Sequence, residues 1–131
     1  MSLEDNKAVI SRFLQEGINQ RNLTVVDEVF ASNHVLRSPL TGMEGVSGTE
    51  VIKRALEDYY EHGTGGRCTI LNQIAEGDWV ATSYTLGQEQ EEHMGVMSNY
   101  LGDSKIQETF VVARDVSESE WPIVLPRQHI N

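Results

Sequence analysis

The chain has 131 residues, of which 39% are hydrophobic, with one cysteine and a formal net charge of −10. These values predict a single soluble domain over residues 1–131, exclude an intrachain disulfide, and argue against nucleic acid or an anionic membrane as a partner. No apolar run approaches the roughly 20 residues that span a bilayer, and the first residues lack a basic, signal-like segment, so we expect a cytoplasmic protein.

The first third of the chain is predicted to contain two helices. Apolar residues recur at helical spacing over 4–19, which predicts the first. A second, shorter helix follows, because Thr24 and Asp27 have the spacing of a capping box and apolar residues continue to Phe30 on its buried face. The stripe of the first helix comprises Val9, Ile10, Phe13, Leu14 and Ile18.

A short extended piece separates these helices from a third. The piece covers 34–38 and ends at Pro39, which cannot donate to a strand ladder. Residues 40–47 contain two glycines and are predicted to form a loop. The third helix then begins at a capping box made by Ser47 and Glu50, and a glycine-rich stretch ends it.

The second half of the chain is predicted to be an antiparallel sheet. Gly/Asp turns at 76–78 and 102–104 each lead into an apolar, β-branched run, and short connections pair consecutive strands antiparallel. The tail over 116–131 contains two prolines in its apolar part, which exclude a regular helix there. We expect this tail to lie along the body or to reach a partner. The strands are expected over 68–74, 79–86, 93–101 and 105–114.

Three motifs give the chain a family resemblance. The stretch AEGDWV at 75–80 is similar to an "aeGDxV" strand entry, and DSKIQETF at 103–110 is similar to a "dGKIxExW" final strand. Ser38-Pro39 followed by SGTEVI at 47–52 is similar to a "DP…GxxGxK" approach to the third helix. In this order the motifs resemble the nuclear transport factor 2-like superfamily, and within it the SnoaL-like polyketide cyclase branch, with ketosteroid isomerases as cousins.

The resemblance implies an α+β cone, in which three N-terminal helices pack on a strongly bent antiparallel sheet around an internal pocket. It also implies a homodimer through the outer face of the sheet. Chemistries in the superfamily include aldol cyclisation, isomerisation, epoxide hydrolysis and dehydration, and many members only bind.

Several catalytic positions of these relatives are substituted in this chain. The Tyr, Asp and acid of ketosteroid isomerases correspond to Phe13, Ser38 and roughly Val96 or Met97, which excludes an isomerase of that type. The His-Asp pair of SnoaL-like cyclases is replaced by Arg37-Ser38, and a late Asp by Arg114. The standard acid–base set of either group is therefore incomplete.

Three residues remain as candidates for catalysis. His93 precedes Met94-Gly95, similar to an "HxG" at the pocket mouth of some SnoaL-like chains, and an imidazole can shuttle a proton; the alternative is a solvated histidine beside two glutamates. His34 lines the pocket if even positions of its strand face inward, or else lies at the surface. Arg37 holds an oxyanion, or forms a surface ion pair, for which Glu44 is a candidate partner.

The last strand and the aromatic residues complete the predicted site. Glu108, Phe110, Val112 and Arg114 share one face of that strand, so Glu108 and Arg114 form either a buried network or an interfacial ion pair. No metal-ligand spacing or phosphate loop is present, so no metal or cofactor is expected. The predicted pocket-lining residues are Phe13, Ser38, Tyr59, Trp79, Tyr84, Tyr100 and Phe110.

Two classes of function fit these observations. The first is binding of a small, mostly apolar ligand in the pocket. Any catalysis would be cofactor-free acid–base chemistry of cyclase, isomerase or lyase type. In it His93 or His34 would act as the base, and Arg37 or a tyrosine would stabilise the oxyanion. The second is a non-catalytic ligand carrier or protein-association module. Ligand binding is the leading hypothesis, and the substituted acid–base positions are the observation that favours the alternative.

Overall fold

The first helix begins with a complete capping box and changes its winding halfway along. In the computed structural model, which describes residues 2–38, 42–62, 66–87 and 93–115, α1 (Leu3–Arg12) starts after Ser2. The Ser2 hydroxyl accepts a hydrogen bond from the amide of Asp5, whose carboxylate accepts one from the Ser2 amide. From Phe13 the chain continues as a π-helix, η1 (Phe13–Asn19). The helix predicted over 4–19 is confirmed in extent but not in winding.

The second helix is shorter than predicted. α2 (Val25–Val29) follows Thr24, whose own backbone angles are helical (φ −66°, ψ −19°), whereas a capping residue is extended. The hydroxyl of Thr24 donates instead to Oδ1 of Asn22 at 2.6 Å, so the predicted capping box is wrong. Phe30 has extended angles and begins β1 (Phe30–Ser38), which starts four residues earlier than the piece predicted at 34–38.

The segment predicted as a loop contains a strand. β2 (Gly42–Ser47) pairs antiparallel with β1, so it covers an edge that would otherwise expose unpaired backbone groups. Gly45 has φ +83°, and a Cβ there would lie 2.7 Å from Cγ1 of Val35, so this close pairing requires glycine. Because Ser47 ends β2, the third helix, α3 (Glu50–His62), starts two residues later than the predicted capping box implies.

The four long strands agree with the sequence prediction to within two residues at each end. The turn between the last two has Asp103 at φ +52° and Ser104 at φ +65°, as expected of a type I′ hairpin. The predicted tail at 116–131 lies outside the described residues. The strands are β3 (Arg67–Glu76), β4 (Trp79–Gly87), β5 (His93–Gly102) and β6 (Lys105–Asp115).

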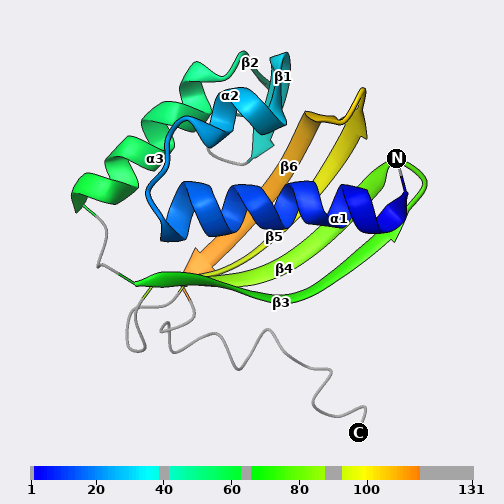
Figure 1. Ribbon diagram of the computed structural model, residues 1–131. Helices are drawn as coiled ribbons and strands as arrows, with labels where there is room; N and C mark the ends of the chain where they lie inside the picture. Colours follow the sequence, from blue (N-terminus) through cyan, green and yellow to red (C-terminus); the bar gives the residue numbers. More distant parts are fainter. Residues whose placement is uncertain (1, 39–41, 63–65, 88–92, 116–131) are drawn as a thin grey trace, which may run out of the picture.

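Within the described residues, six strands form one open, curved sheet in the order β2-β1-β6-β5-β4-β3 (Figure 1). β1 pairs with β6 in parallel and every other neighbouring pair is antiparallel, so the predicted antiparallel sheet is in fact mixed. The parallel pair is possible because the chain between these strands makes a long crossover through α3 and the other strands. The register shifts between Ile70 and Asn72, and between Tyr100 and Leu101, and such irregularities bend a sheet.

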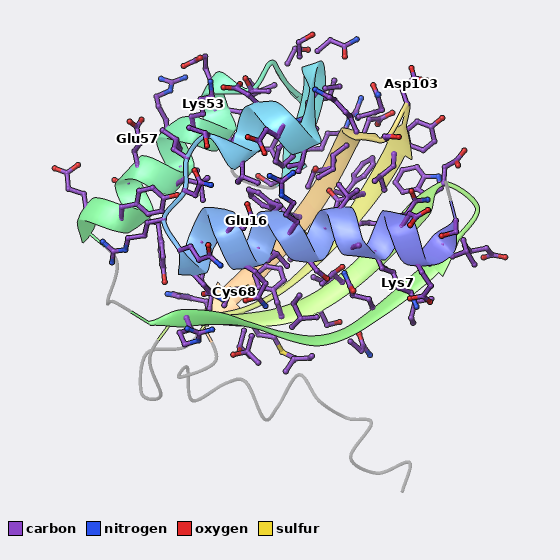
Figure 2. The ribbon with its side chains drawn as sticks, in the orientation of Figure 1. Lys7, Glu16, Lys53, Glu57, Cys68 and Asp103 are labelled. Carbon is purple, nitrogen blue, oxygen red and sulfur yellow. The ribbon has the colours of Figure 1, made fainter. Side chains whose placement is uncertain are left out.

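The helices cover the concave face of this sheet. α1 crosses β3, β4, β5 and β6, while α2 and α3 lie at the side of β1 and β2 (Figure 1). Figure 2 shows Cys68 between the first helix and the sheet and Glu57 on the outward side of α3, while Lys53 of α3 forms an ion pair with Asp27 of α2. The core side chains that are at most 3% exposed include Ile10, Leu14, Val25, Val26, Val80, Leu101 and Ile106.

Candidate functional site

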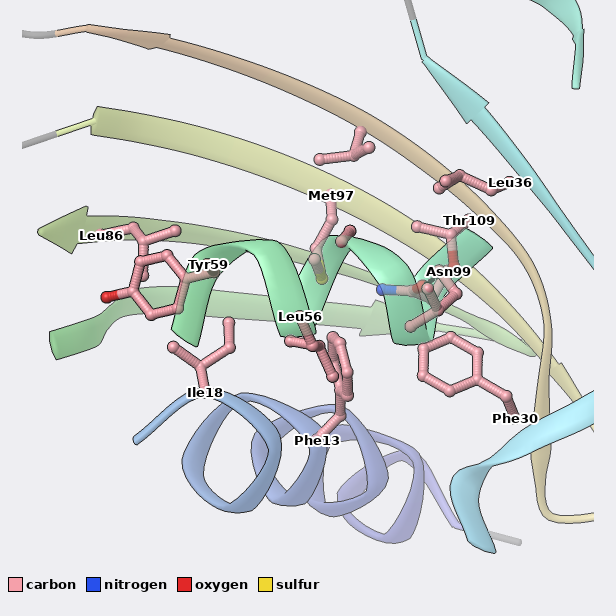
Figure 3. Close-up of a pocket in the computed structure, with 13 residues that line it drawn as sticks. Phe13, Ile18, Phe30, Leu36, Leu56, Tyr59, Leu86, Met97, Asn99 and Thr109 are labelled. Carbon is pink, nitrogen blue, oxygen red and sulfur yellow. Dashed lines mark hydrogen bonds between the residues drawn. The ribbon is translucent and has the colours of Figure 1, made fainter. Parts of the chain in front are cut away.

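A cavity of about 210 Å³ lies between η1, α3 and the concave face of the sheet (Figure 3). Strand pleating directs alternate residues into it, so that β5 contributes Met97 and Asn99 while β6 contributes Thr109 and Val111. α3 contributes residues spaced three or four apart, which lie on one face of an α-helix, and η1 contributes Phe13 and Ile18. The described lining comprises Phe13, Ile18, Phe30, Leu36, Ile52, Ala55, Leu56, Tyr59, Leu86, Met97, Asn99, Thr109 and Val111.

The described part of this lining carries no charged side chain. The Tyr59 hydroxyl donates a hydrogen bond to the carbonyl oxygen of Gly66 at 2.8 Å, and burial raises the pKa of Tyr59. Apart from this tyrosine, Asn99 and Thr109 supply the polar atoms among the described lining side chains. The wall therefore offers a ligand apolar contact over most of its area and, at one place, a small polar group.

That polar group belongs to a buried chain of three side chains. Nε2 of His34 lies 2.7 Å from Oγ1 of Thr109, and the Thr109 hydroxyl donates to Oδ1 of Asn99 at 2.6 Å. The chain exists because β1 and β5 flank β6 in the sheet, with Leu36 opposite Thr109 on one side and Asn99 opposite it on the other. His34 is fully buried behind the wall, and burial lowers its pKa to about 4, so it is neutral at pH 7.

Two nitrogen atoms of these three hydrogen-bonded side chains are buried without a hydrogen-bond partner, Nδ2 of Asn99 and Nδ1 of His34. In Figure 3 the side-chain nitrogen of Asn99 is directed into the cavity, toward the side of Leu56 and Met97. A buried polar atom without a partner costs roughly 1–3 kcal/mol. Such a group in a native wall calls for a physical explanation.

The structure does not bring the three candidate catalytic residues together. His34 is near the cavity but behind its wall, where it packs edge-on against the Phe30 ring with centroids 4.7 Å apart. His93 is exposed at the start of β5 and is not among the described lining residues. Arg37 forms an ion pair with Glu108 and lies over the ring of Phe110, on the opposite face of the sheet.

Three of the aromatic residues predicted in the pocket lie on the outer face of the sheet instead. Trp79 is 40% exposed and Phe110 is 37% exposed, and the Trp79 ring contacts those of Tyr100 and Phe110 at centroid distances of 5.3 and 6.1 Å. The pocket assignment of these residues is wrong. Pleating turns their side chains to one face of the sheet and those of their neighbours Val80, Asn99 and Thr109 to the other.

The other predicted pocket residues occupy different positions. Phe13 and Tyr59 are in the described lining. Tyr84 is a buried core residue whose ring lies across Gly95, where a Cβ would come within 2.4 Å of it. Ser38 ends β1 and is not among the described lining residues. Glu108 forms an ion pair with Arg37, and the side chain of Arg114, its predicted partner, lies outside the described ones.

Sequence reasoning missed the two residues that give the cavity its polarity. Asn99 shares its strand face with Met97, and Thr109 shares its face with Val111, so strand alternation does contain this information. What the sequence does not reveal is which face of β5 and β6 meets the helices. In the described chain, no three His, Cys, Asp or Glu side chains gather as a metal site requires, and no helix is both long and apolar enough to cross a membrane.

Comparison with solved structures shows the fold. A proposed ketosteroid isomerase from Kribbella flavida is 19% identical and aligns over 98% of this chain and 89% of its own, with a TM-score of 0.74. IdmH from Streptomyces antibioticus, a proposed polyketide cyclase, is 16% identical over 82% of this chain and 91% of its own, with a TM-score of 0.70. A nuclear transport factor 2-like protein of unknown function from Burkholderia xenovorans is 14% identical over 93% of both chains, with a TM-score of 0.70.

No curated protein sequence matches the chain. Residues 10–102, which are most of the chain, match the family described as the SnoaL-like domain. These residues include η1, α3 and most of the strands that line the cavity. The chain therefore belongs to the SnoaL-like domain family, and its fold is that of nuclear transport factor 2-like proteins.

Proposed function

We propose that the protein binds a small, mostly apolar molecule in the cavity between η1, α3 and the sheet. The observation that carries this proposal is a space of about 210 Å³ with a largely apolar lining. One water needs about 10–15 Å³ of such space, so the cavity is large enough for many waters but offers them few hydrogen bonds. A ligand that covers this wall gains roughly 25 cal/mol for each Å² of apolar surface removed from water.

Binding is better supported than acid–base catalysis of cyclase or isomerase type. A general base must reach the reacting atom and titrate near the working pH. His93 is exposed, Arg37 lies on the far face, and burial holds the pKa of His34 at about 4. The described lining contains no histidine and no carboxylate. A non-catalytic ligand carrier therefore agrees best with this geometry.

A variant that fills the cavity tests this proposal. Ala55 lines the cavity from α3 and is itself exposed, so Ala55→Trp should place an indole into the mouth at little cost to folding. The probe is the methylene analogue of camphor, a compact hydrocarbon in which C=CH₂ replaces C=O. Its Kd is measured by calorimetric titration into each protein. We expect its Kd to rise at least about tenfold, which is about 1.4 kcal/mol of binding free energy.

The matched control is Glu57→Trp, which adds the same side chain to an exposed position of the same helix. This variant should bind the probe like the unmodified protein. Equal binding to Ala55→Trp, or no binding to the unmodified protein, would contradict the proposal.

We also propose that two copies of the chain associate through the outer face of the sheet. Large apolar side chains that are 37–65% exposed gather there, among them Ile74, Trp79, Phe110 and Val112. The same face carries the Arg37–Glu108 ion pair, so it offers both a cation and an anion. A two-fold interface brings such a patch against itself, and opposite charges can then meet across it. This favours a second copy over a strongly charged partner.

A further inference from the structure

The direction of the buried hydrogen-bond chain follows from counting protons. The hydroxyl of Thr109 has one proton, which it donates to Oδ1 of Asn99. Its oxygen must therefore accept a hydrogen bond from His34, which requires the tautomer with the proton on Nε2. His34 thus fixes the orientation of Thr109, and Thr109 fixes that of the Asn99 amide.

The consequence of this direction is that the cavity wall presents a hydrogen-bond donor. With Oδ1 of Asn99 occupied by Thr109, the two N–H groups on Nδ2 lack a partner and point into an apolar space. The reversed chain would need the other tautomer of His34, and it would present Oδ1 as an acceptor. The polarity of the wall is thus coupled to the tautomer of a histidine that the ligand does not touch.

We propose that Asn99 is the polar anchor of the cavity and selects neutral, compact ligands that carry a carbonyl oxygen, with Thr109 and His34 as positioning residues. The inference rests on the proposed function, because it requires that a ligand enters the cavity. A carbonyl oxygen accepts the hydrogen bond that Nδ2 offers, and the rest of the ligand contacts apolar side chains. A carboxylate is disfavoured, because the described lining has no cation to offset the burial of its charge.

Two probes of one shape test the anchor. Camphor and its methylene analogue differ in C=O against C=CH₂, and each is titrated into the unmodified protein and into Asn99→Leu. The ratio of the two Kd values is taken in each protein, and comparing this ratio between the two proteins cancels the difference in hydration between the probes. We expect the preference for camphor to be about tenfold greater in the unmodified protein, the fold-change of one typical hydrogen bond.

The outcomes separate the anchor from the binding function. If both probes bind and the ratio is the same in both proteins, the anchor is wrong and the proposed function stands. If neither probe binds to the unmodified protein, the proposed function fails, and the anchor fails with it. A shared ratio would also result if a retained water, rather than the ligand, were the partner of Asn99.

A second pair of variants guards against loss of folding in Asn99→Leu. Thr109→Val removes the hydroxyl at nearly constant volume, while Thr109→Ser retains it. We expect the serine variant to keep the preference for camphor and the valine variant to lose most of it. Equal preference in the two variants would overturn the positioning role of Thr109.

The tautomer of His34 gives a readout that does not depend on affinity. We expect the imidazole ¹⁵N shifts of the camphor complex to show a neutral ring with the proton on Nε2. A ring protonated on Nδ1 would reverse the chain and contradict the anchor. The shifts of exposed His93 in the same spectrum serve as the reference for a solvated ring.

Discussion

His34 illustrates how one buried ring links the sheet, the cavity and pH. It is fully buried, it packs against Phe30, and its one described side-chain hydrogen bond goes to Thr109. Burial without a nearby anion disfavours the charged ring, which is why its pKa falls to about 4. The alternation of residues 34–38 places His34 on one strand face with Leu36 but leaves open whether that face points inward, and the partner on β6 depends on a parallel pairing that no local pattern reveals.

This histidine should make the free energy of unfolding depend on pH. Its pKa is lower in the folded than in the unfolded chain, so the unfolded chain alone takes up the proton as the pH falls from 6.5 toward 4. The contribution of neutral His34 to the free energy of unfolding is therefore complete above pH 6.5. It is lost as the pH falls toward 4, and the loss is on the order of 3 kcal/mol. Urea unfolding at about pH 7 and about pH 4.5 measures this loss.

The comparison that assigns the effect is between His34→Gln and His93→Gln. The first removes the buried ring and should show a smaller loss of stability on acidification than the unmodified protein. The second removes an exposed ring and should show the same loss. Equal losses in all three proteins would refute the assignment to His34.

At the scale of elements, the strands and their turns follow from the sequence and the π-helix does not. Gly/Asp turns and β-branched runs fix the ends of the four long strands, because these signals are local. The winding of η1 depends instead on packing, since Gly17 lets Phe13 and Val25 approach, with a Cβ there meeting both at 3.2–3.3 Å. The sequence does not predict the strand at Gly42–Ser47 either, because its pairing with β1 leaves no local pattern.

The end of η1 is joined to the sheet by a side chain that imitates a strand. Nδ2 of Asn19 donates to the carbonyl oxygen of Cys68 at 3.0 Å, and the Cys68 amide donates to Oδ1 of Asn19 at 2.8 Å. Asn19→Asp removes the donor and adds a charge beside a carbonyl oxygen. We expect the free energy of unfolding to fall by roughly 1–3 kcal/mol, measured by urea denaturation.

Gln20→Glu is the control for this change, because it adds the same charge at the next, exposed position. Its stability should stay within about 0.5 kcal/mol of the unmodified protein, as is usual for surface substitutions. A similar loss in both variants would attribute the effect to charge rather than to the paired hydrogen bonds.

On the scale of the whole molecule, the sheet separates two surfaces of different character. The concave face and the helices enclose the cavity, while the outer face exposes the aromatic cluster of Trp79, Tyr100 and Phe110. Alternation in the sequence predicts that Glu108 and Phe110 share a face and that Thr109 and Val111 share the other. It cannot assign either face to the helices, because that choice is made by contacts between distant segments. This is why the sequence places the aromatic residues in the pocket and does not identify Asn99 and Thr109 as its polar groups.

The outer face predicts a dimer that a single charge should disrupt. Val112 is 60% exposed in the single chain, so Val112→Glu should fold normally. In a two-fold interface the new carboxylates would lie near each other and near the apolar surface of the partner, and burying an unpaired charge is costly. We expect light scattering after size-exclusion chromatography to give twice the chain mass for the unmodified protein and the chain mass of 14.7 kDa for the variant.

Leu3→Glu separates this effect from a general effect of added charge. Leu3 is 46% exposed at the start of α1, the helix that lies on the concave side of the sheet (Figure 1). Since a net charge of −10 already repels a second copy everywhere, one more carboxylate far from the interface should leave the dimer intact. A monomeric unmodified protein, or a Val112→Glu variant that stays dimeric, would contradict association through this face. In that case the exposed aromatic cluster would require a different partner.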